Sequence, residues 1–101
     1  MNNNHINRES ILSELRLLKP EFEKNYGITR LGLFGSIARN EIHENSDIDI
    51  VVEMREPDLF YMVHIKEILE NDFKRPVDVI HFRENMNKYL KTRIQAEALY
   101  V

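Results

Sequence analysis

Residues 31–54 read LGLFGSIARNEIHENSDIDIVVEM, and the rest of the chain is organised around them. The pattern predicts a strand that ends at Gly35-Ser36, a short helical turn, a polar loop, and a second strand that carries Asp47 and Asp49. Strand side chains alternate between two faces, so the two carboxylates project from one face and the intervening apolar residues from the other. Two carboxylates held side by side on a strand favour a divalent-metal site.

A third carboxylate lies further along the chain, in the β-branched run of residues 77–80. Val77 and Val79 share one face of this expected strand, which leaves Asp78 on the other face with Ile80. A carboxylate is poorly suited to an apolar core, so its position calls for a chemical reason. From a neighbouring strand, Asp78 could bind the metal nearest an incoming hydroxyl and help to accept its proton.

The Gly-Ser pair supplies what a triphosphate needs. Gly35 lets the backbone approach a phosphate closely, and Ser36 adds a hydroxyl donor at the start of a helical turn whose free N–H groups favour an anion. Asp47 and Asp49 can bind Mg²⁺, and two such ions about 3.5 to 4 Å apart can share a carboxylate. Arg39 could reach a phosphate or be an ordinary surface residue. Together these groups indicate a metal-nucleotide site for metal-assisted phosphoryl or nucleotidyl transfer.

Hydrophobic periodicity and Gly/Pro signals predict the remaining elements. They are a helix over about 8–26 that ends at Gly27, strands over 28–34 and 47–53, a turn over 37–40, a helix over about 57–71, a strand over 77–80 and a helix over about 87–100. Pro20 should kink or split the first helix, because it removes a backbone donor. Pro57 should begin the second long helix, and its buried side should carry Leu59, Met62, Ile65 and Leu69. Only about a dozen residues join the first two strands, so we expect antiparallel neighbours.

Length and composition bound the class of protein. At 101 residues the chain is expected to be one domain over 1–101, of the α/β (α+β) class, with a small mixed sheet flanked by helices. There is no Cys, which excludes thiolate chemistry and disulfides. The net charge of −3 argues against broad nucleic-acid binding. Without signal-peptide features or a membrane-length apolar run, the expected location is cytoplasmic, with no membrane contact.

Other polar residues are less informative. The four histidines lack metal-ligand spacing, so no catalytic histidine is predicted. Basic residues cluster near the C-terminus at Arg83, Lys88, Lys91 and Arg93. A solvated helix face is their simplest interpretation, and contact between the last three and a triphosphate or a partner's acidic side is the alternative.

Residues 33–52, LFGSIARNEIHENSDIDIVV, resemble the signature of the DNA polymerase beta-like nucleotidyltransferase superfamily. Given its length, the chain is most similar to the minimal nucleotidyltransferases that serve as antitoxins beside HEPN-domain toxins. The resemblance implies that Gly35 and Ser36 bind the nucleotide phosphates and that Asp47 and Asp49 ligate Mg²⁺, with Asp78 as the third carboxylate. Asn40 stands where many relatives have Gly. Asn tolerates left-handed backbone geometry, so the turn should survive.

The resemblance also implies a reaction: Mg²⁺-dependent transfer of AMP from ATP to a tyrosine of a partner HEPN ribonuclease, which silences that toxin. Little chain is left to enclose an acceptor, which favours a macromolecular acceptor and a hetero-oligomer. Three alternatives stay open. The chain could modify a small molecule such as an aminoglycoside, could neutralise a toxin by binding and occlusion, or could carry exposed carboxylates without a catalytic role.

Overall fold

The structure is a computed structural model that describes residues 6–43 and 46–101. One of the four histidines, His5, and residues 44–45 of the predicted polar loop lie outside the described residues. The described elements alternate helix and strand. They are α1 (Arg8–Tyr26), β1 (Ile28–Phe34), α2 (Gly35–Ala38), β2 (Ile48–Met54), α3 (Leu59–Phe73), β3 (Val77–His81), α4 (Lys88–Glu97) and β4 (Leu99–Tyr100).

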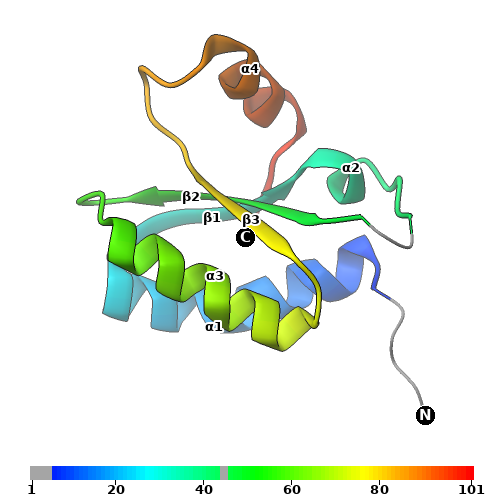
Figure 1. Cartoon of the computed structure of the whole chain (residues 1–101), viewed down its shortest axis with the longest axis horizontal. Coiled ribbons are helices and arrows are strands. Elements are labelled where there is room, and N and C mark those ends of the chain that lie inside the picture. Colours follow the sequence, from blue (N-terminus) through cyan, green and yellow to red (C-terminus); the bar gives the residue numbers. More distant parts are fainter. Residues whose placement is uncertain (1–5, 44–45) are drawn as a thin grey trace.

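The strands form one mixed sheet in the order β3-β2-β1-β4. β1 pairs antiparallel with both β2 and β4, and β2 pairs parallel with β3. Figure 1 shows α1 and α3 covering one face of the sheet, with α2 and α4 on the opposite side. The predicted mixed α/β fold and the antiparallel pairing of the first two strands are therefore confirmed. No helix in the described ranges combines the length and apolar character needed to cross a bilayer.

Each face of the sheet has its own hydrophobic core. The larger core lies between the sheet and the helices α1 and α3, and it contains Ile48 and Ile50 of β2 together with Val77 of β3. The smaller core lies under α4 and joins Val51 of β2 to Ile94 of α4. Strand alternation therefore leaves the side chains of Asp49 and Asp78 on the α4 side, away from the larger core.

α1 begins and ends where the sequence predicted. The side chain of Asn7 caps its N-terminus, and Gly27, with φ of 69°, caps its C-terminus in the left-handed conformation. Of the two outcomes predicted for Pro20, the split is wrong, because α1 continues through this residue, and the kink stays a prediction. Pro20 is exposed, while Leu15 and Phe22 on either side of it are fully buried and hold both halves of the helix against the sheet.

The start of α3 also differs from the prediction. Asp58 is its N-cap and accepts two backbone N–H groups of the first turn, so Pro57 lies outside the helix. Leu59, predicted to be buried, is 82% exposed in that first turn. The other predicted positions are confirmed, because Ile65 and Leu69 are fully buried and Met62 is partly buried against the larger core.

The C-terminal segment was predicted as helix to Tyr100, which is wrong. α4 ends at Glu97, and the next residues form the short strand β4 against β1, with Gly32 opposite Tyr100. Gly32 makes this packing possible, since a Cβ there would lie 2.8 Å from Cδ1 of Tyr100. The guanidinium of Arg30 stacks on the same ring at 3.7 Å. A strand of two residues is too short to produce a periodic signal in the sequence.

Candidate active site

The sheet register brings two of the predicted carboxylates together. Asp49 of β2 lies opposite Phe34, the last residue of β1, on one side and opposite Asp78 of β3 on the other. Residues paired across neighbouring strands project from the same face, and adjacent strands are only about 4.8 Å apart. The carboxylates of Asp49 and Asp78 are therefore neighbours beneath α4, at the end of β1.

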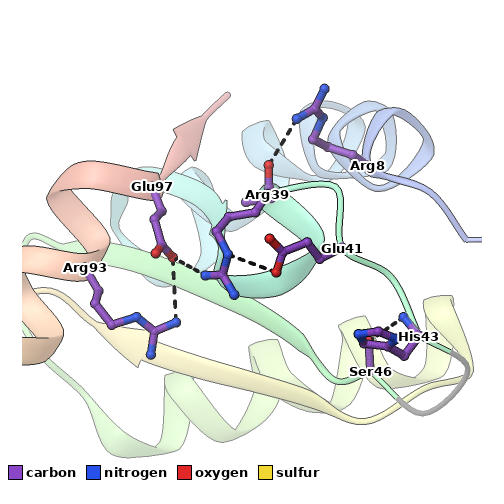
Figure 2. Close-up of polar contacts among 8 residues, drawn as sticks. Arg8, Arg39, Glu41, His43, Ser46, Arg93 and Glu97 are labelled. Carbon is purple, nitrogen blue, oxygen red and sulfur yellow. Dashed lines mark hydrogen bonds and ion pairs between the residues drawn. The ribbon is translucent and has the colours of Figure 1, made fainter.

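Asp47 immediately precedes β2, and the backbone that positions it is held by several hydrogen bonds. The N–H of His43 donates to Oγ of Ser46 at 2.8 Å, and the N–H of Ser46 donates back to the carbonyl of His43 at 3.0 Å. Figure 2 shows this contact beside the start of β2. Arg75 also donates to the carbonyl of Ser46, at 3.2 Å. His43 thus has a structural role in the loop that leads to Asp47.

The electrostatics identify Asp49 as the centre of a carboxylate cluster. The pKa of Asp49 is raised to about 6, chiefly by burial and then by the negative charges of Asp78 and Asp47. The positive charges of Arg93 and Arg39 act in the opposite direction and lower this pKa. The carboxylate of Asp49 therefore interacts with both other predicted carboxylates and with two guanidiniums.

This cluster suits a divalent cation that also binds phosphate. Asp49 is half-buried, whereas Asp47 and Asp78 are exposed. Among the described residues, no three His, Cys, Asp or Glu side chains already lie close enough to enclose a metal ion. Mg²⁺ does not need such a cage, because it usually takes one or two carboxylates and completes its shell with water and substrate phosphates. The negative charges of Asp47 and Asp78 repel that of Asp49 and contribute to its raised pKa. A bound cation would offset this repulsion.

Gly35 lies against the carboxylate of Asp49. A Cβ at Gly35 would overlap Oδ2 of Asp49 and stand 3.0 Å from its Cγ. Its φ of 82° also favours glycine. The helical turn was predicted over residues 37–40, but α2 already starts at Gly35 and ends at Ala38, so Ser36 lies inside it and is half-buried. Gly35, at the start of α2, is thus in direct contact with the carboxylate of Asp49.

The end of α2 is fixed by its own turn and by α1. Asn40 adopts the left-handed conformation, with φ of 65°, as expected for the residue that replaces glycine. Its N–H donates to the carbonyl of Ile37 at 2.9 Å. Nη1 of Arg8 donates to the carbonyl of Ala38 at 3.1 Å and ties α2 to the start of α1 (Figure 2).

Arg39 is held between two carboxylates. Its Nη1 donates to Oε1 of Glu97 at 3.0 Å, and its Nε donates to Oε1 of Glu41 at 3.3 Å. Nη2 of Arg93 lies 3.7 Å from the same Oε1 of Glu97. Figure 2 shows Glu97 between the two arginines, which come from α4 and from the end of α2. Sequence reasoning saw Arg93 only as one member of a basic cluster, and it missed Glu97.

The rest of that basic cluster lies elsewhere. Nζ of Lys91 forms a 2.8 Å ion pair with Glu84, and Lys88 and Arg83 are exposed. Of the four basic residues, only Arg93 is among the charges that act on Asp49. The sequence cluster therefore divides into one residue at the candidate site and three outside it.

Comparison with known proteins identifies the family of this chain. A family model described as a nucleotidyltransferase domain matches residues 15–101. The chain belongs to this nucleotidyltransferase family. Protein adenylyltransferase MntA of Thermococcus cleftensis is 32% identical over 94 residues, which cover 92% of this nucleotidyltransferase and 94% of MntA. MJ0126 of Methanocaldococcus jannaschii, provisionally named a protein adenylyltransferase, is 34% identical over 88 residues, or 86% of this chain and 90% of MJ0126.

Solved structures share the fold. One, provisionally described as a minimal nucleotidyltransferase, has a TM-score of 0.79 and 26% identity, and the match covers 96% of this chain and 98% of that one. A toxin–antitoxin structure with AMP-PNP has a TM-score of 0.69 at 23% identity, with 94% and 72% covered. These matches confirm the predicted fold class and the resemblance to minimal nucleotidyltransferases. The roles of Gly35, Ser36, Arg39 and the three aspartates stay predictions.

Proposed function

We propose that this nucleotidyltransferase is a protein adenylyltransferase, which transfers AMP from ATP to a hydroxyl group of a partner protein in the presence of Mg²⁺. The observation that carries the proposal is the register of Asp49 opposite Asp78, in contact with Gly35. With this juxtaposition, a cation held by the carboxylates would lie beside a turn suited to phosphate, at the end of one strand. The similarity to relatives named as protein adenylyltransferases, over nearly the whole chain, supports the choice of reaction.

In this proposal the aspartates bind the cation, and one of them also accepts the proton of the attacking hydroxyl. Asp47 and Asp49 would ligate Mg²⁺, with Asp78 as a third ligand on the neighbouring strand. Bound Mg²⁺ would neutralise phosphate charge and favour ionisation of the attacking hydroxyl. Because Asp78 is exposed on the same face, it can also accept the proton that the hydroxyl loses.

The residues at the end of β1 would bind the nucleotide. Gly35 has no side chain to obstruct a phosphate, Ser36 offers a hydroxyl donor, and Arg39 brings a positive charge. The acceptor oxygen attacks the α-phosphorus, and the bond from that phosphorus to the bridging oxygen of the β-phosphate breaks. Pyrophosphate leaves with the bonding electrons, and AMP stays on the acceptor.

The acceptor would be a protein that brings its own surface. Asp47 and Asp78 are both exposed, so the reacting face is open rather than enclosed. A similar fold occurs in the MNT antitoxin complexed with a tri-AMPylated HEPN toxin of Shewanella oneidensis, at a TM-score of 0.63 and 20% identity. We therefore take a HEPN-type ribonuclease toxin as the partner, a tyrosine as the acceptor, and the cytoplasm as the place of reaction. The protein would act as its antitoxin.

Neutralisation by occlusion is the second candidate, and one observation favours it. Leu59, Phe60 and Val63, all near the start of α3, are 82%, 77% and 51% exposed. Apolar side chains gathered on a surface are typical of a protein-binding face. A toxin bound there could be silenced without any transfer of AMP.

A labelling experiment separates these candidates. The protein is incubated with ATP labelled in the α-phosphate, with and without Mg²⁺ and a co-purified HEPN-domain toxin, and the toxin's mass is then measured. Label and an added AMP on the toxin support the proposal. The double variant Asp47→Asn, Asp49→Asn should transfer no label, whereas Glu67→Gln, at an exposed site on α3, should behave as wild type. Full neutralisation by the double variant would instead establish occlusion, and label on an aminoglycoside would establish a small-molecule transferase.

A further inference from the structure

We infer that Arg93 binds the β- and γ-phosphates of the nucleotide together with Arg39, and that Glu97 is a positioning residue that holds the two guanidiniums side by side. This inference rests on the proposed function, because it assigns further residues to the same nucleotide site. It adds α4 to the elements that build that site. The group recognised is the pyrophosphate part of a nucleoside triphosphate.

The geometry of the three side chains is the first argument. A single oxygen, Oε1 of Glu97, accepts from Nη1 of Arg39 at 3.0 Å and lies 3.7 Å from Nη2 of Arg93. Arg93 and Glu97 are one helical turn apart on α4, so the backbone fixes their relation. Two guanidiniums this close repel each other, and a shared carboxylate offsets that repulsion.

The backbone places the pair near the carboxylates, because Arg39 directly follows α2 and the first residue of α2, Gly35, lies against Asp49. Positive charge on Arg93 lowers the pKa of Asp49, and it does so more strongly than the charge on Arg39. Lys91, on the same helix, is paired with Glu84 and does not contribute. Arg93 is therefore joined to Arg39 through Glu97 and its charge acts on Asp49, while Lys91 is paired with Glu84.

The pair also retains the groups that phosphate recognition needs. The side chains of Arg39 and Arg93 are 38% and 36% exposed, whereas that of Glu97 is only 19% exposed. Within the described residues Arg93 forms no ion pair except the long one with Glu97, which leaves its other N–H donors available. A guanidinium presents these donors as a planar fork that matches phosphate oxygens, and a lysine ammonium does not.

A charge argument explains why a second arginine is useful. Two Mg²⁺ ions, three carboxylates and a triphosphate carrying four negative charges leave an excess of negative charge, and this excess concentrates on pyrophosphate as it leaves. Arg39 is already engaged by Glu41 as well as by Glu97. Arg93, on α4, has only the long contact with Glu97 and therefore has more N–H donors available for phosphate than Arg39 has.

The test compares binding of ATP and of AMP to the full chain in Mg²⁺ by isothermal titration calorimetry. We expect Arg93→Gln to weaken ATP binding about tenfold or more, which is typical for loss of a charge-assisted hydrogen bond. AMP binding should change less than twofold, because AMP lacks the two phosphates concerned. Arg93→Lys should restore ATP binding only in part, and Glu97→Ala should weaken ATP binding severalfold while sparing AMP.

Lys91→Gln is the matched control, since it breaks an ion pair on the same helix without affecting Asp49. If Arg93→Gln and Lys91→Gln bind ATP equally well, or if Arg93→Gln weakens ATP and AMP binding by the same factor, the inference is wrong and the network merely fastens α4 to α2. Thermal melts of each variant identify loss of folding, and Arg93→Lys keeps the charge and the side-chain length. If wild-type protein binds no ATP and modifies no partner, the proposed function itself fails.

Discussion

Replacing Asp49 by Asn should make the metal-free protein more stable at neutral and higher pH. The pKa of Asp49 rises from 3.8 to about 6 on folding, chiefly through burial and then through the charges of Asp78 and Asp47. A raised carboxyl pKa means that folding opposes ionisation. The ionised carboxylate therefore lowers the free energy of unfolding above about pH 6, and this penalty disappears below about pH 4, where the group is protonated in both states.

The size of the effect follows from the same numbers. A pKa difference of about 2 corresponds to roughly 3 kcal/mol, at about 1.4 kcal/mol for each pH unit. Asp49 is only half-buried, so solvent screening reduces this figure, and we expect about 1.5 kcal/mol. For a domain of this size, such a gain raises the melting temperature by about 6 to 12 °C.

The assay is urea unfolding in EDTA, followed by circular dichroism at several pH values from 4 to 8. Asp49→Asn should exceed wild type in free energy of unfolding at pH 8, and the two should converge as the pH approaches 4. Glu67→Gln, which neutralises an exposed carboxylate, serves as the control and should change little at either pH. A variant that is no more stable than wild type at pH 8, or that keeps its full advantage at pH 4, would refute the reasoning.

Three further predictions follow from the same contacts. Gly35→Ala should abolish ATP binding by calorimetry and cost about 1 to 3 kcal/mol in urea unfolding, because the new Cβ overlaps the carboxylate of Asp49 and the residue has positive φ. Mg²⁺ affinity should fall as the pH drops below about 6, approaching tenfold per pH unit, since Asp49 must lose its proton to bind the cation. Titration calorimetry at pH 5 and 7 checks this prediction, and equal affinities at the two pH values would contradict it. Gly32→Val should destabilise the fold by about 1 to 3 kcal/mol in urea, because its side chain would displace Tyr100 and β4, whereas replacing exposed Thr29 by Val should cost much less.

The sequence was most informative where strand alternation decides the outcome. The bounds of β1 agree with the prediction, and the expected faces of Asp49 and Asp78 agree with the two cores. Both results follow from the two-residue period of a strand, in which a single slip would move every side chain to the other face. The faces of the strands decide whether Asp49 and Asp78 can meet, so their proximity could be predicted from the sequence.

The missed features depend on contacts between distant parts of the chain. Arg39 and Glu97 are 58 residues apart, and only the packing of α2 against α4 brings them together. β4 can pair with β1 because Gly32 leaves room for the ring of Tyr100. No local sequence pattern predicts this contact. Leu59 was assigned to the buried side of a helix predicted to begin at Pro57, whereas the helix begins only at Leu59, after the N-cap Asp58. Local propensity cannot resolve such tertiary effects.

The exposure of Asp47 and Asp78 has a consequence for how much nucleotide is hydrolysed without an acceptor. An open reacting face admits water, which is a nucleophile of the same kind as the acceptor hydroxyl. Nucleotide bound to the solitary protein should therefore be lost slowly as AMP and pyrophosphate, and arrival of the acceptor should suppress that leak. Pyrophosphate release that does not decline when the acceptor is added would show that water is excluded by some other means.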